Sequence, residues 1–222
     1  GDIVSADGEV LATSIVNEDG SQTRQYPYDC VFAHVVGTSE INKSGIELSE
    51  DMSLITSDLD PLDKLKNDIM DQKNPGNTVK TTLNAKLQQV AHDALADRSG
   101  AVVALEPSTG KVLALISKPD YDANTLLENY DSILEDETSK VLLNQATQGL
   151  FVPGSIFKVV TSLAYLRSDL SDDAYGYYCD GYITLDSDDG ESYLRCYGGE
   201  EHGSLDLTDS FAESCNASYA NI

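Results

Sequence analysis

The strongest constraint on the fold is the order of elements between residues 84 and 118. An amphipathic helix is predicted from Asn84 to Arg98, because apolar residues recur at spacings of three and four and Gly100 ends the pattern. The apolar face comprises Leu83, Leu87, Val90, Ala91, Ala94 and Leu95. Two apolar β-runs follow, joined by the turn Ser108–Lys111. A helix followed by an antiparallel hairpin favours an α+β fold over a doubly wound sheet.

The region before this helix is predicted to contain short strands and turns, followed by a broken helix. Asp7–Gly8 and Asp19–Gly20 are turn signals between apolar runs. Tyr26–Gly37 is a run of β-branched and aromatic residues, which indicates a further strand. Residues 45–70 then have a helical pattern that is interrupted at Pro61.

Composition excludes several classes of partner. The chain has 222 residues, with 38 acidic residues against 14 basic ones and a formal net charge of −24. This charge argues against nucleic acid and against an anionic membrane face, because there is no basic surface to contact phosphates. A hydrophobic content of 41% rules out a wholly disordered chain. Residues 168–209 carry twelve acidic residues against Arg195 alone, and we interpret them as a solvated surface loop.

The cysteines and histidines lack the sequence spacing of a zinc site. They are Cys30, Cys179, Cys196, Cys215, His34, His92 and His202. No two cysteines form C-x-x-C and the histidines are scattered, so no metal is expected. Only Cys179 and Cys196 are separated by a short loop. They could form a disulfide in an oxidising compartment, or they could be two small buried side chains.

The first residues that indicate chemistry are Ser155 and Lys158, in the sequence FVPGSIFK. Pro153–Gly154 predicts a helix start at Ser155, which places Lys158 one turn along the same face. An amine at that spacing can reach the serine hydroxyl, and burial would lower its pKa enough for it to act as a base. The alternative is an N-cap serine with a solvated lysine. A second S-x-x-K, Ser108–Lys111, spans a hairpin turn and is interpreted as accidental.

A second polar pair, Ser214 and Asn216, follows another predicted helical stretch. A hydroxyl and a carboxamide two residues apart can point into one cleft. The hydroxyl can relay a proton there, and the amide can hold a substrate backbone or the lysine. The alternative is the capping of a helix end, because S-x-N alone is a common pattern. The pair strengthens the interpretation of Ser155 and Lys158 as a nucleophile and its base.

The order S-x-x-K, then S-x-N, resembles the penicillin-binding proteins and the serine β-lactamases, whose third motif is K-[ST]-G. The resemblance covers most of the chain and fits the monofunctional, class B transpeptidases. The segments that carry it are YPYDCVFAHVVG, SGIELSED, GNTVKTTLNAKLQQVAHDAL, GAVVALEPSTGKVLALISKPDYDANTL, NQATQGLFVPGSIFKVVTSLAYL and HGSLDLTDSFAESCNASYA. It implies an α+β penicillin-binding transpeptidase (serine β-lactamase-like) domain, incomplete here and preceded by a small β-rich pedestal. Residues 1–74 would form the pedestal or linker region, and residues 76–222 the first part of the transpeptidase domain.

The third motif of this family has no counterpart after Asn216. The K-[ST]-G of this chain, Lys43–Gly45, lies upstream of Ser155 and is interpreted as a turn. We therefore expect the true third motif beyond Ile222, in a longer protein of which this chain is the N-terminal portion. The chain alone is expected to be inactive.

The resemblance implies a peptidoglycan D,D-transpeptidase that crosslinks stem peptides through an acyl-serine intermediate and is a target of β-lactams. Ser155 would be the nucleophile, Lys158 its base and Ser214 a proton relay, while Asn216 would bind the substrate. No cofactor is implied. The implied partners are stem peptides, β-lactam antibiotics and, through the N-terminal region, cell-division or elongation proteins.

The resemblance also implies a location on the extracytoplasmic face of the bacterial cell membrane, with a tether formed by an N-terminal membrane helix outside this chain. The alternative function is a penicillin-sensing or non-catalytic scaffold protein of the same fold.

Overall fold

The computed structural model describes residues 1–70, 73–136, 138–168, 175–187 and 190–222. The chain forms two compact units, Gly1–Leu150 and Phe151–Ile222, and each is described by itself. None of the helices among the described residues combines the length and the apolar character that a membrane crossing requires.

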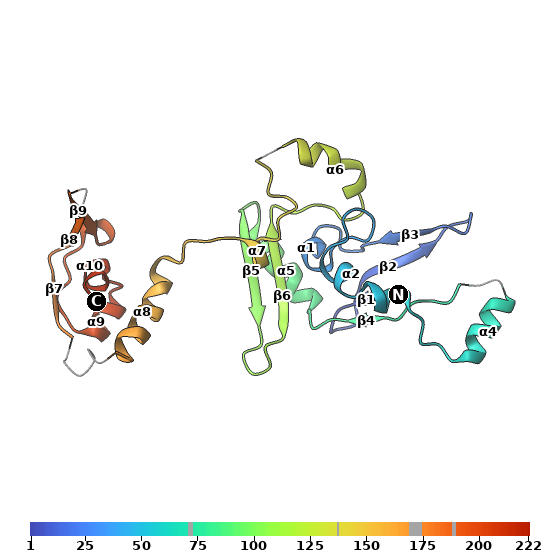
Figure 1. Cartoon of the computed structure of the whole chain (residues 1–222), viewed down its shortest axis with the longest axis horizontal. Coiled ribbons are helices and arrows are strands. Elements are labelled where there is room, and N and C mark those ends of the chain that lie inside the picture. Colours follow the sequence, from blue (N-terminus) through green and yellow to red (C-terminus); the bar gives the residue numbers. More distant parts are fainter. Residues whose placement is uncertain (71–72, 137, 169–174, 188–189) are drawn as a thin grey trace. The chain divides into compact units, whose positions relative to one another are not determined.

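The first unit begins with a four-stranded sheet in the order β3-β2-β1-β4 (Figure 1). Its strands are β1 (Ile3–Val4), β2 (Val10–Val16), β3 (Gln22–Gln25) and β4 (Val79–Lys80). β2 pairs antiparallel with both β1 and β3, and β1 pairs parallel with β4. The turns predicted at Asp7–Gly8 and Asp19–Gly20 are therefore confirmed, because each joins two antiparallel strands.

Short helices follow the sheet in sequence. They are α1 (Ala33–Val36), α2 (Gly45–Ser49), α3 (Asp51–Ile55) and α4 (Pro61–Ile69). The helical pattern over 45–70 is confirmed, and Pro61 begins α4 instead of merely interrupting a helix. Lys43–Gly45 ends a loop, with Ser44 as the N-cap residue of α2 and Gly45 at φ 55°.

The strand predicted over Tyr26–Gly37 is wrong, because this segment forms turns and α1. Phe32, Ala33 and Val36 are buried in the core of the first unit. A helical turn brings side chains three and four residues apart onto one face, whereas in a strand Ala33 would point away from the face that Phe32 and Val36 share. Tertiary packing therefore outweighs the β-propensity of the valines and aromatic residues.

The helix and hairpin predicted over 84–118 are present as α5 (Ala85–Leu95), β5 (Gly100–Leu105) and β6 (Val112–Lys118). The Asn84 side chain caps α5 by accepting a hydrogen bond from the Leu87 amide at 2.8 Å. The helix ends before the predicted Arg98, at Leu95, and Gly100 is the first residue of β5. β5 and β6 pair antiparallel, as predicted.

The predicted apolar face of α5 is only partly the buried face. Leu87 and Val90 are exposed, whereas Ala85 and Gln88 are buried. Gln88 lies against β6 and hydrogen-bonds its backbone, so a polar side chain occupies a position that hydrophobic patterning assigns to the surface. The remaining helices of this unit are α6 (Leu126–Glu135) and α7 (Gln145–Gln148).

The predicted pedestal, residues 1–74, shares one hydrophobic core with residues from the start of the predicted transpeptidase part, 76–222. Ile3, Leu11 and Phe32 belong to the same buried cluster as Leu83 and Ala123. Residues 1–74 are therefore not packed apart from residues 76–150 in this structure. The division into a pedestal and a transpeptidase part remains a prediction.

The second unit begins with a short helical turn, η1 (Gly154–Ile156), that continues into α8 (Phe157–Leu166). It also contains β7 (Tyr177–Cys179), β8 (Tyr182–Ser187), β9 (Gly190–Arg195), η3 (Tyr197–Gly199), β10 (Gly203–Leu205), α9 (Leu207–Ala212) and α10 (Asn216–Asn221). β7 pairs with β10, and β8 pairs with β9, both antiparallel. Over its described residues, the acidic stretch 168–209 contains the strands β7 to β10, η3 and the start of α9, which corrects its interpretation as a loop.

A small core holds the second unit together. Its buried members are Cys179, Cys196, Leu205, Cys215 and Ala217. α10 packs against β7, β8 and β9, so the strand pairs and the C-terminal helix meet at these residues. Three of the four cysteines of the chain therefore lie at the centre of this unit.

Candidate active site

The predicted nucleophile and base lie on consecutive helical turns at the start of the second unit. Ser155 is in η1, and Lys158 is in the first turn of α8. Gly154 has φ 55°, a left-handed conformation that suits glycine and turns the chain into the helix. The prediction that Ser155 lies at a helix start is confirmed. Ser155 is exposed, whereas Lys158 is buried.

The Lys158 amine points at the S-x-N segment. Its Nζ donates hydrogen bonds to the Ser214 hydroxyl at 2.9 Å and to the Asn216 side-chain oxygen at 2.8 Å. A third bond goes to the Ser214 carbonyl oxygen. An ammonium group has three N–H donors, so these partners satisfy all of them. Nζ also lies 5.4 Å from the centre of the Tyr219 ring, within range of a cation–π contact.

Ser214 connects the lysine to the nucleophile. Its Oγ accepts from Lys158 and donates to the Ser155 Oγ at 3.0 Å. Lys158, Ser214 and Ser155 therefore form one hydrogen-bonded chain that ends at an exposed hydroxyl. The structure brings together all four residues that the sequence analysis selected, Asn216 included.

The backbone of Ser214 is held in an unusual conformation. Its φ is 50°, in the left-handed region that few residues other than glycine occupy. Its amide donates to the Phe211 carbonyl at 3.1 Å, which closes the turn after α9. This turn presents both the hydroxyl and the carbonyl of Ser214 to Lys158. Backbone strain of this kind often accompanies functional geometry.

Asn216 is anchored from the opposite side. Its Nδ2 donates to the carbonyl of Arg195, at the end of β9, at 3.1 Å, while its oxygen accepts from Lys158. The carboxamide therefore has a fixed orientation, with its oxygen toward the amine. The S-x-N segment is thus tied both to α8 and to the β8–β9 hairpin.

Burial lowers the pKa of Lys158 from its usual value of 10.5, whereas the charges of Cys215 and Cys196 raise it. Burial is the larger effect, because it removes water from the charged amine. A lysine with a lowered pKa becomes neutral, and so able to accept a proton, at a lower pH than a solvated one. The arrangement can therefore activate a serine hydroxyl for attack on a carbonyl.

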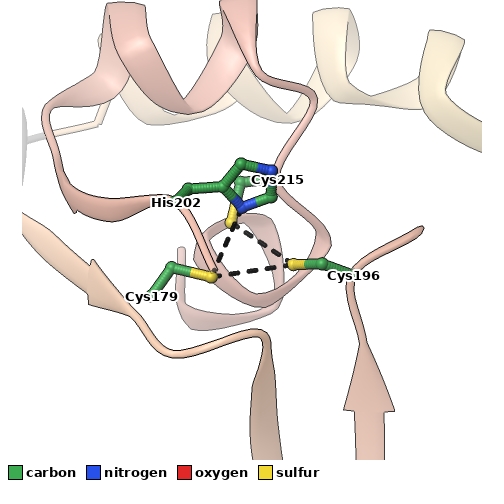
Figure 2. Close-up of side chains that lie close together, drawn as sticks. All are labelled: Cys179, Cys196, His202 and Cys215. Carbon is green, nitrogen blue, oxygen red and sulfur yellow. Dashed lines mark hydrogen bonds between the residues drawn. The ribbon is translucent and has the colours of Figure 1, made fainter. Parts of the chain in front are cut away.

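The Cys179 and Cys196 sulfur atoms lie 3.7 Å apart as free thiols. An S–S bond is about 2.05 Å long, so the disulfide remains a prediction. Cys215 and His202, which the sequence analysis did not select, lie beside them (Figure 2). One feature of the sequence could have indicated this group: a glycine lies two residues after each of Cys179 and Cys196, and glycine allows a tight turn around a cysteine sulfur.

A second group, Cys30, His92 and Asp120, lies in the first unit but is not arranged as a catalytic triad. The His92 Nε2 is 2.7 Å from Asp120 and 3.8 Å from the Cys30 sulfur. A triad needs the acid and the nucleophile on different ring nitrogens, so that one orients the ring while the other accepts the proton. Here both contacts use the same nitrogen.

Comparison with known proteins shows to which family the chain that carries Ser155, Lys158, Ser214 and Asn216 belongs. Residues 100–222 match the penicillin binding protein transpeptidase domain, and residues 1–79 match the penicillin binding protein A dimerisation domain. The chain belongs to the penicillin-binding protein transpeptidase family. Membership was predicted from the S-x-x-K and S-x-N motifs, and both the family and the fold are confirmed.

Individual relatives support the same family. The peptidoglycan D,D-transpeptidase PbpA of Mycobacterium tuberculosis is 32% identical over 99% of this chain and 48% of its own length. The D,D-transpeptidase domain structure from Eggerthella lenta is 32% identical, with a TM-score of 0.79, covering 95% of this chain and 46% of that one. The imipenem acyl-enzyme complex of M. tuberculosis penicillin-binding protein A is 30% identical, with a TM-score of 0.82, covering 100% of this chain and 54% of that one. The chain thus spans about half the length of these relatives.

Proposed function

We propose that this protein is a peptidoglycan D,D-transpeptidase that crosslinks stem peptides through an acyl-serine intermediate. The observation that carries the proposal is the hydrogen-bonded chain Lys158–Ser214–Ser155, with Asn216 fixing the amine. An exposed hydroxyl connected to a buried amine of lowered pKa is the arrangement that nucleophilic acyl transfer requires.

The first step is attack by the Ser155 Oγ on the carbonyl of the penultimate D-alanine. When Lys158 is neutral, the direction of the hydrogen bonds reverses: Ser155 donates to Ser214, and Ser214 donates to the lysine. The proton of Ser155 then reaches Nζ through the Ser214 hydroxyl, over O···O and N···O distances of 3.0 and 2.9 Å. The backbone amide of Ser155 contributes to stabilising the oxyanion that forms.

The second step is collapse of the tetrahedral intermediate. The bond to the terminal D-alanine breaks, Ser214 delivers a proton to the departing amine, and the acyl group stays on Ser155. An amine from a neighbouring stem peptide then attacks this ester and forms the crosslink, which frees the serine. β-Lactams resemble the D-Ala-D-Ala end and acylate Ser155 in the same way.

Asn216 binds the substrate in this proposal. Its carboxamide is held between Lys158 and the end of β9, so its position is set before a substrate arrives. The relatives support the substrate class: PbpA is named a peptidoglycan D,D-transpeptidase, and the M. tuberculosis complex is an imipenem acyl-enzyme.

The N-terminal region is proposed to contact protein partners at the extracytoplasmic face of the bacterial cell membrane, among them division or elongation proteins. The match of residues 1–79 to a dimerisation domain supports an interaction role for this region. The formal charge of −24 fits neither nucleic acid nor an anionic lipid surface as the partner.

Covalent labelling of the full-length protein with a fluorescent penicillin tests the acyl-serine step. The wild type is expected to retain the label after denaturation, and Ser155→Ala is expected to lose it. Ser108→Ala is the matched control, because Ser108 begins the other S-x-x-K but lies in the turn between β5 and β6. A wild type that does not label would refute the proposal.

Turnover separates the transpeptidase from a penicillin-sensing or scaffold protein of the same fold. A transpeptidase releases D-alanine from a D-Ala-D-Ala peptide or the corresponding thioester and transfers the acyl group to an added amine. Labelling by penicillin without release from either substrate would favour the sensing protein.

A further inference from the structure

Four potential metal ligands converge in the core of the second unit. They are the sulfur atoms of Cys179, Cys196 and Cys215 and a ring nitrogen of His202, and all four lie within 4.8 Å of one another (Figure 2). They come from four places in the chain: Cys179 ends β7, Cys196 follows β9, His202 lies in the loop before β10, and Cys215 is the N-cap residue of α10. The fold, and not a short sequence motif, brings them together.

The spacing of the four atoms fits a single tetrahedral ion. The sulfur of Cys196 is 3.7 Å from that of Cys179 and 3.7 Å from that of Cys215, and His202 Nδ1 is 3.5 Å from the Cys179 sulfur. With zinc–sulfur bonds of about 2.3 Å and zinc–nitrogen bonds of about 2.0–2.1 Å, a tetrahedron separates two sulfurs by about 3.8 Å and sulfur from nitrogen by about 3.5 Å. The side chains therefore need little movement to surround an ion.

The backbone is arranged to hydrogen-bond the sulfur atoms. Backbone amides donate to two of them, from Gly181 to Cys179 at 3.4 Å and from Ser218 to Cys215 at 3.3 Å. Such bonds stabilise the negative charge on a thiolate ligand. Gly181 has φ 90°, and a side chain there would place its Cβ 2.7 Å from the Gly199 carbonyl oxygen, so the two loops approach too closely for another residue.

A set of free thiols does not fully explain why these side chains are buried together. Cys179 and Cys215 are fully buried and Cys196 nearly so, whereas His202 is half-buried. A disulfide would join two of the three sulfurs and leave the third beside a histidine with no covalent or metal partner. A zinc ion engages all four groups at once, and Cys₃His is an established class of structural zinc site.

We propose that Cys179, Cys196, His202 and Cys215 bind one zinc ion as a structural site. Binding releases the protons of the three thiols, and His202 coordinates through Nδ1 of the neutral ring. Because the protein supplies all four ligands, no open position remains for a catalytic water. The proposal replaces the expectation, drawn from sequence spacing alone, that the chain has no metal site.

The zinc ion would hold the S-x-N segment in place. Cys215 lies between Ser214 and Asn216, and Cys196 directly follows Arg195, whose carbonyl binds the Asn216 side chain. One ligand of the ion thus lies between the two residues that bind Lys158, and a second follows the residue that holds Asn216 in place. This positioning role rests on the proposed transpeptidase function, whereas metal binding itself does not.

Metal content of the full-length protein tests the binding. Protein purified without chelator is expected to contain one equivalent of zinc, with three sulfur and one nitrogen neighbours by X-ray absorption. After zinc removal under reducing conditions, titration with Co²⁺ is expected to give the intense visible bands of a tetrahedral thiolate complex that saturate at one equivalent. Zinc-free protein that gives no such bands would overturn the inference, as would a Cys179–Cys196 disulfide in protein without metal.

Substitutions locate the site. Cys179→Ser and His202→Gln are expected to abolish stoichiometric zinc binding, and both residues lie outside the lysine-binding segment. Cys30→Ser and His92→Gln are the matched controls, because they change the same residue types in the first unit and are expected to keep one equivalent. Loss of zinc in the controls but not in the two site variants would contradict the assignment.

Penicillin labelling tests the positioning role separately. Removal of zinc is expected to slow labelling of the wild type by about 10- to 100-fold, as activity typically falls when groups that position a site are lost. Added Zn²⁺ is expected to restore the labelling rate. Cys179→Ser should label slowly with or without zinc. An unchanged labelling rate after zinc removal would refute the positioning role. Stoichiometric zinc in a protein that never labels would support the metal site and refute the transpeptidase.

Discussion

In the proposed mechanism, Lys158 has to meet two opposing requirements. It must be buried enough to lose its proton, and it must remain connected to a serine that a large substrate can reach. The structure separates the two properties: the amine is buried, while the Ser155 and Ser214 side chains are exposed. The hydroxyl of Ser214 spans the gap between them. In the proposed mechanism, Ser214 therefore acts with the base as much as with the substrate.

The lowered pKa of Lys158 predicts the pH dependence of acylation. The rate of reaction with a β-lactam should rise with pH as the lysine loses its proton, and it should level off below the usual lysine pKa of 10.5. Asn216→Asp places a carboxylate where an amide oxygen now lies, 2.8 Å from Nζ. The negative charge stabilises the ammonium, so the rising limb should move to higher pH by about 1–3 units.

The measurement is the second-order acylation rate of the full-length protein between neutral and alkaline pH. Asn221→Asp is the control, because it adds the same charge at the other end of α10 and should leave the limb in place. A limb that moved to lower pH in Asn216→Asp would rule out Lys158 as the group that titrates.

At the scale of elements, the buried side chain of Gln88 hydrogen-bonds helix α5 to its neighbours. Gln88 is fully buried, and its amide nitrogen donates to the carbonyls of Val31 at 2.9 Å and Leu115 at 2.8 Å. Its oxygen accepts from the Leu115 amide, also at 2.8 Å. One residue thus links α5 to β6 and to the segment before α1.

Gln88→Leu should destabilise the first unit strongly. It keeps a similar volume but leaves buried backbone groups without partners, each at a cost of about 1–3 kcal/mol, so we expect a loss of about 3 kcal/mol in the free energy of unfolding. Gln89→Leu removes a hydrogen bond to Asp93 within the same helix and should change stability by less than about 0.5 kcal/mol. Chemical denaturation followed by circular dichroism measures both. Equal losses in the two variants would contradict the role given to Gln88.

Elements governed by local signals were predictable from the sequence. The turns at Asp7–Gly8 and Asp19–Gly20, the helix start at Asn84 and the β5–β6 hairpin each depend on residues close together in the chain. Tyr26–Gly37 was not predictable in this way, because its helical turn is decided by the core that it enters.

The active-site residues were accessible to sequence reasoning because each motif holds its key residues within three positions. Ser155 and Lys158 lie on consecutive helical turns, and Ser214 and Asn216 flank the N-cap residue of α10. The cysteine–histidine cluster was not accessible, since Cys179, His202 and Cys215 come from different elements that only the fold brings together. The role of Ser214 as the link between lysine and nucleophile also required the three-dimensional arrangement.

At the scale of the whole molecule, this chain corresponds to about half of its relatives. It contains the S-x-x-K and S-x-N motifs, but its K-[ST]-G is Lys43–Gly45, at the start of α2 in the first unit. That tripeptide lies on no strand of the described structure and so does not match the third motif of the family.

The 222-residue chain on its own should therefore react poorly with penicillin. We expect labelling at least about 100-fold slower than in the full-length protein, comparable to the loss of an oxyanion-hole donor. The comparison uses matched concentrations of both proteins, with circular dichroism to establish that the short chain is folded. Labelling of the folded short chain at the full-length rate would show that the S-x-x-K and S-x-N motifs suffice for acylation.

The network from Ser155 to Asn216 lies entirely within Phe151–Ile222. Its distances are therefore independent of whatever arrangement the two units adopt. In evolutionary terms, selection on the proposed reaction would act first on Phe151–Ile222, the unit that contains all four of these residues.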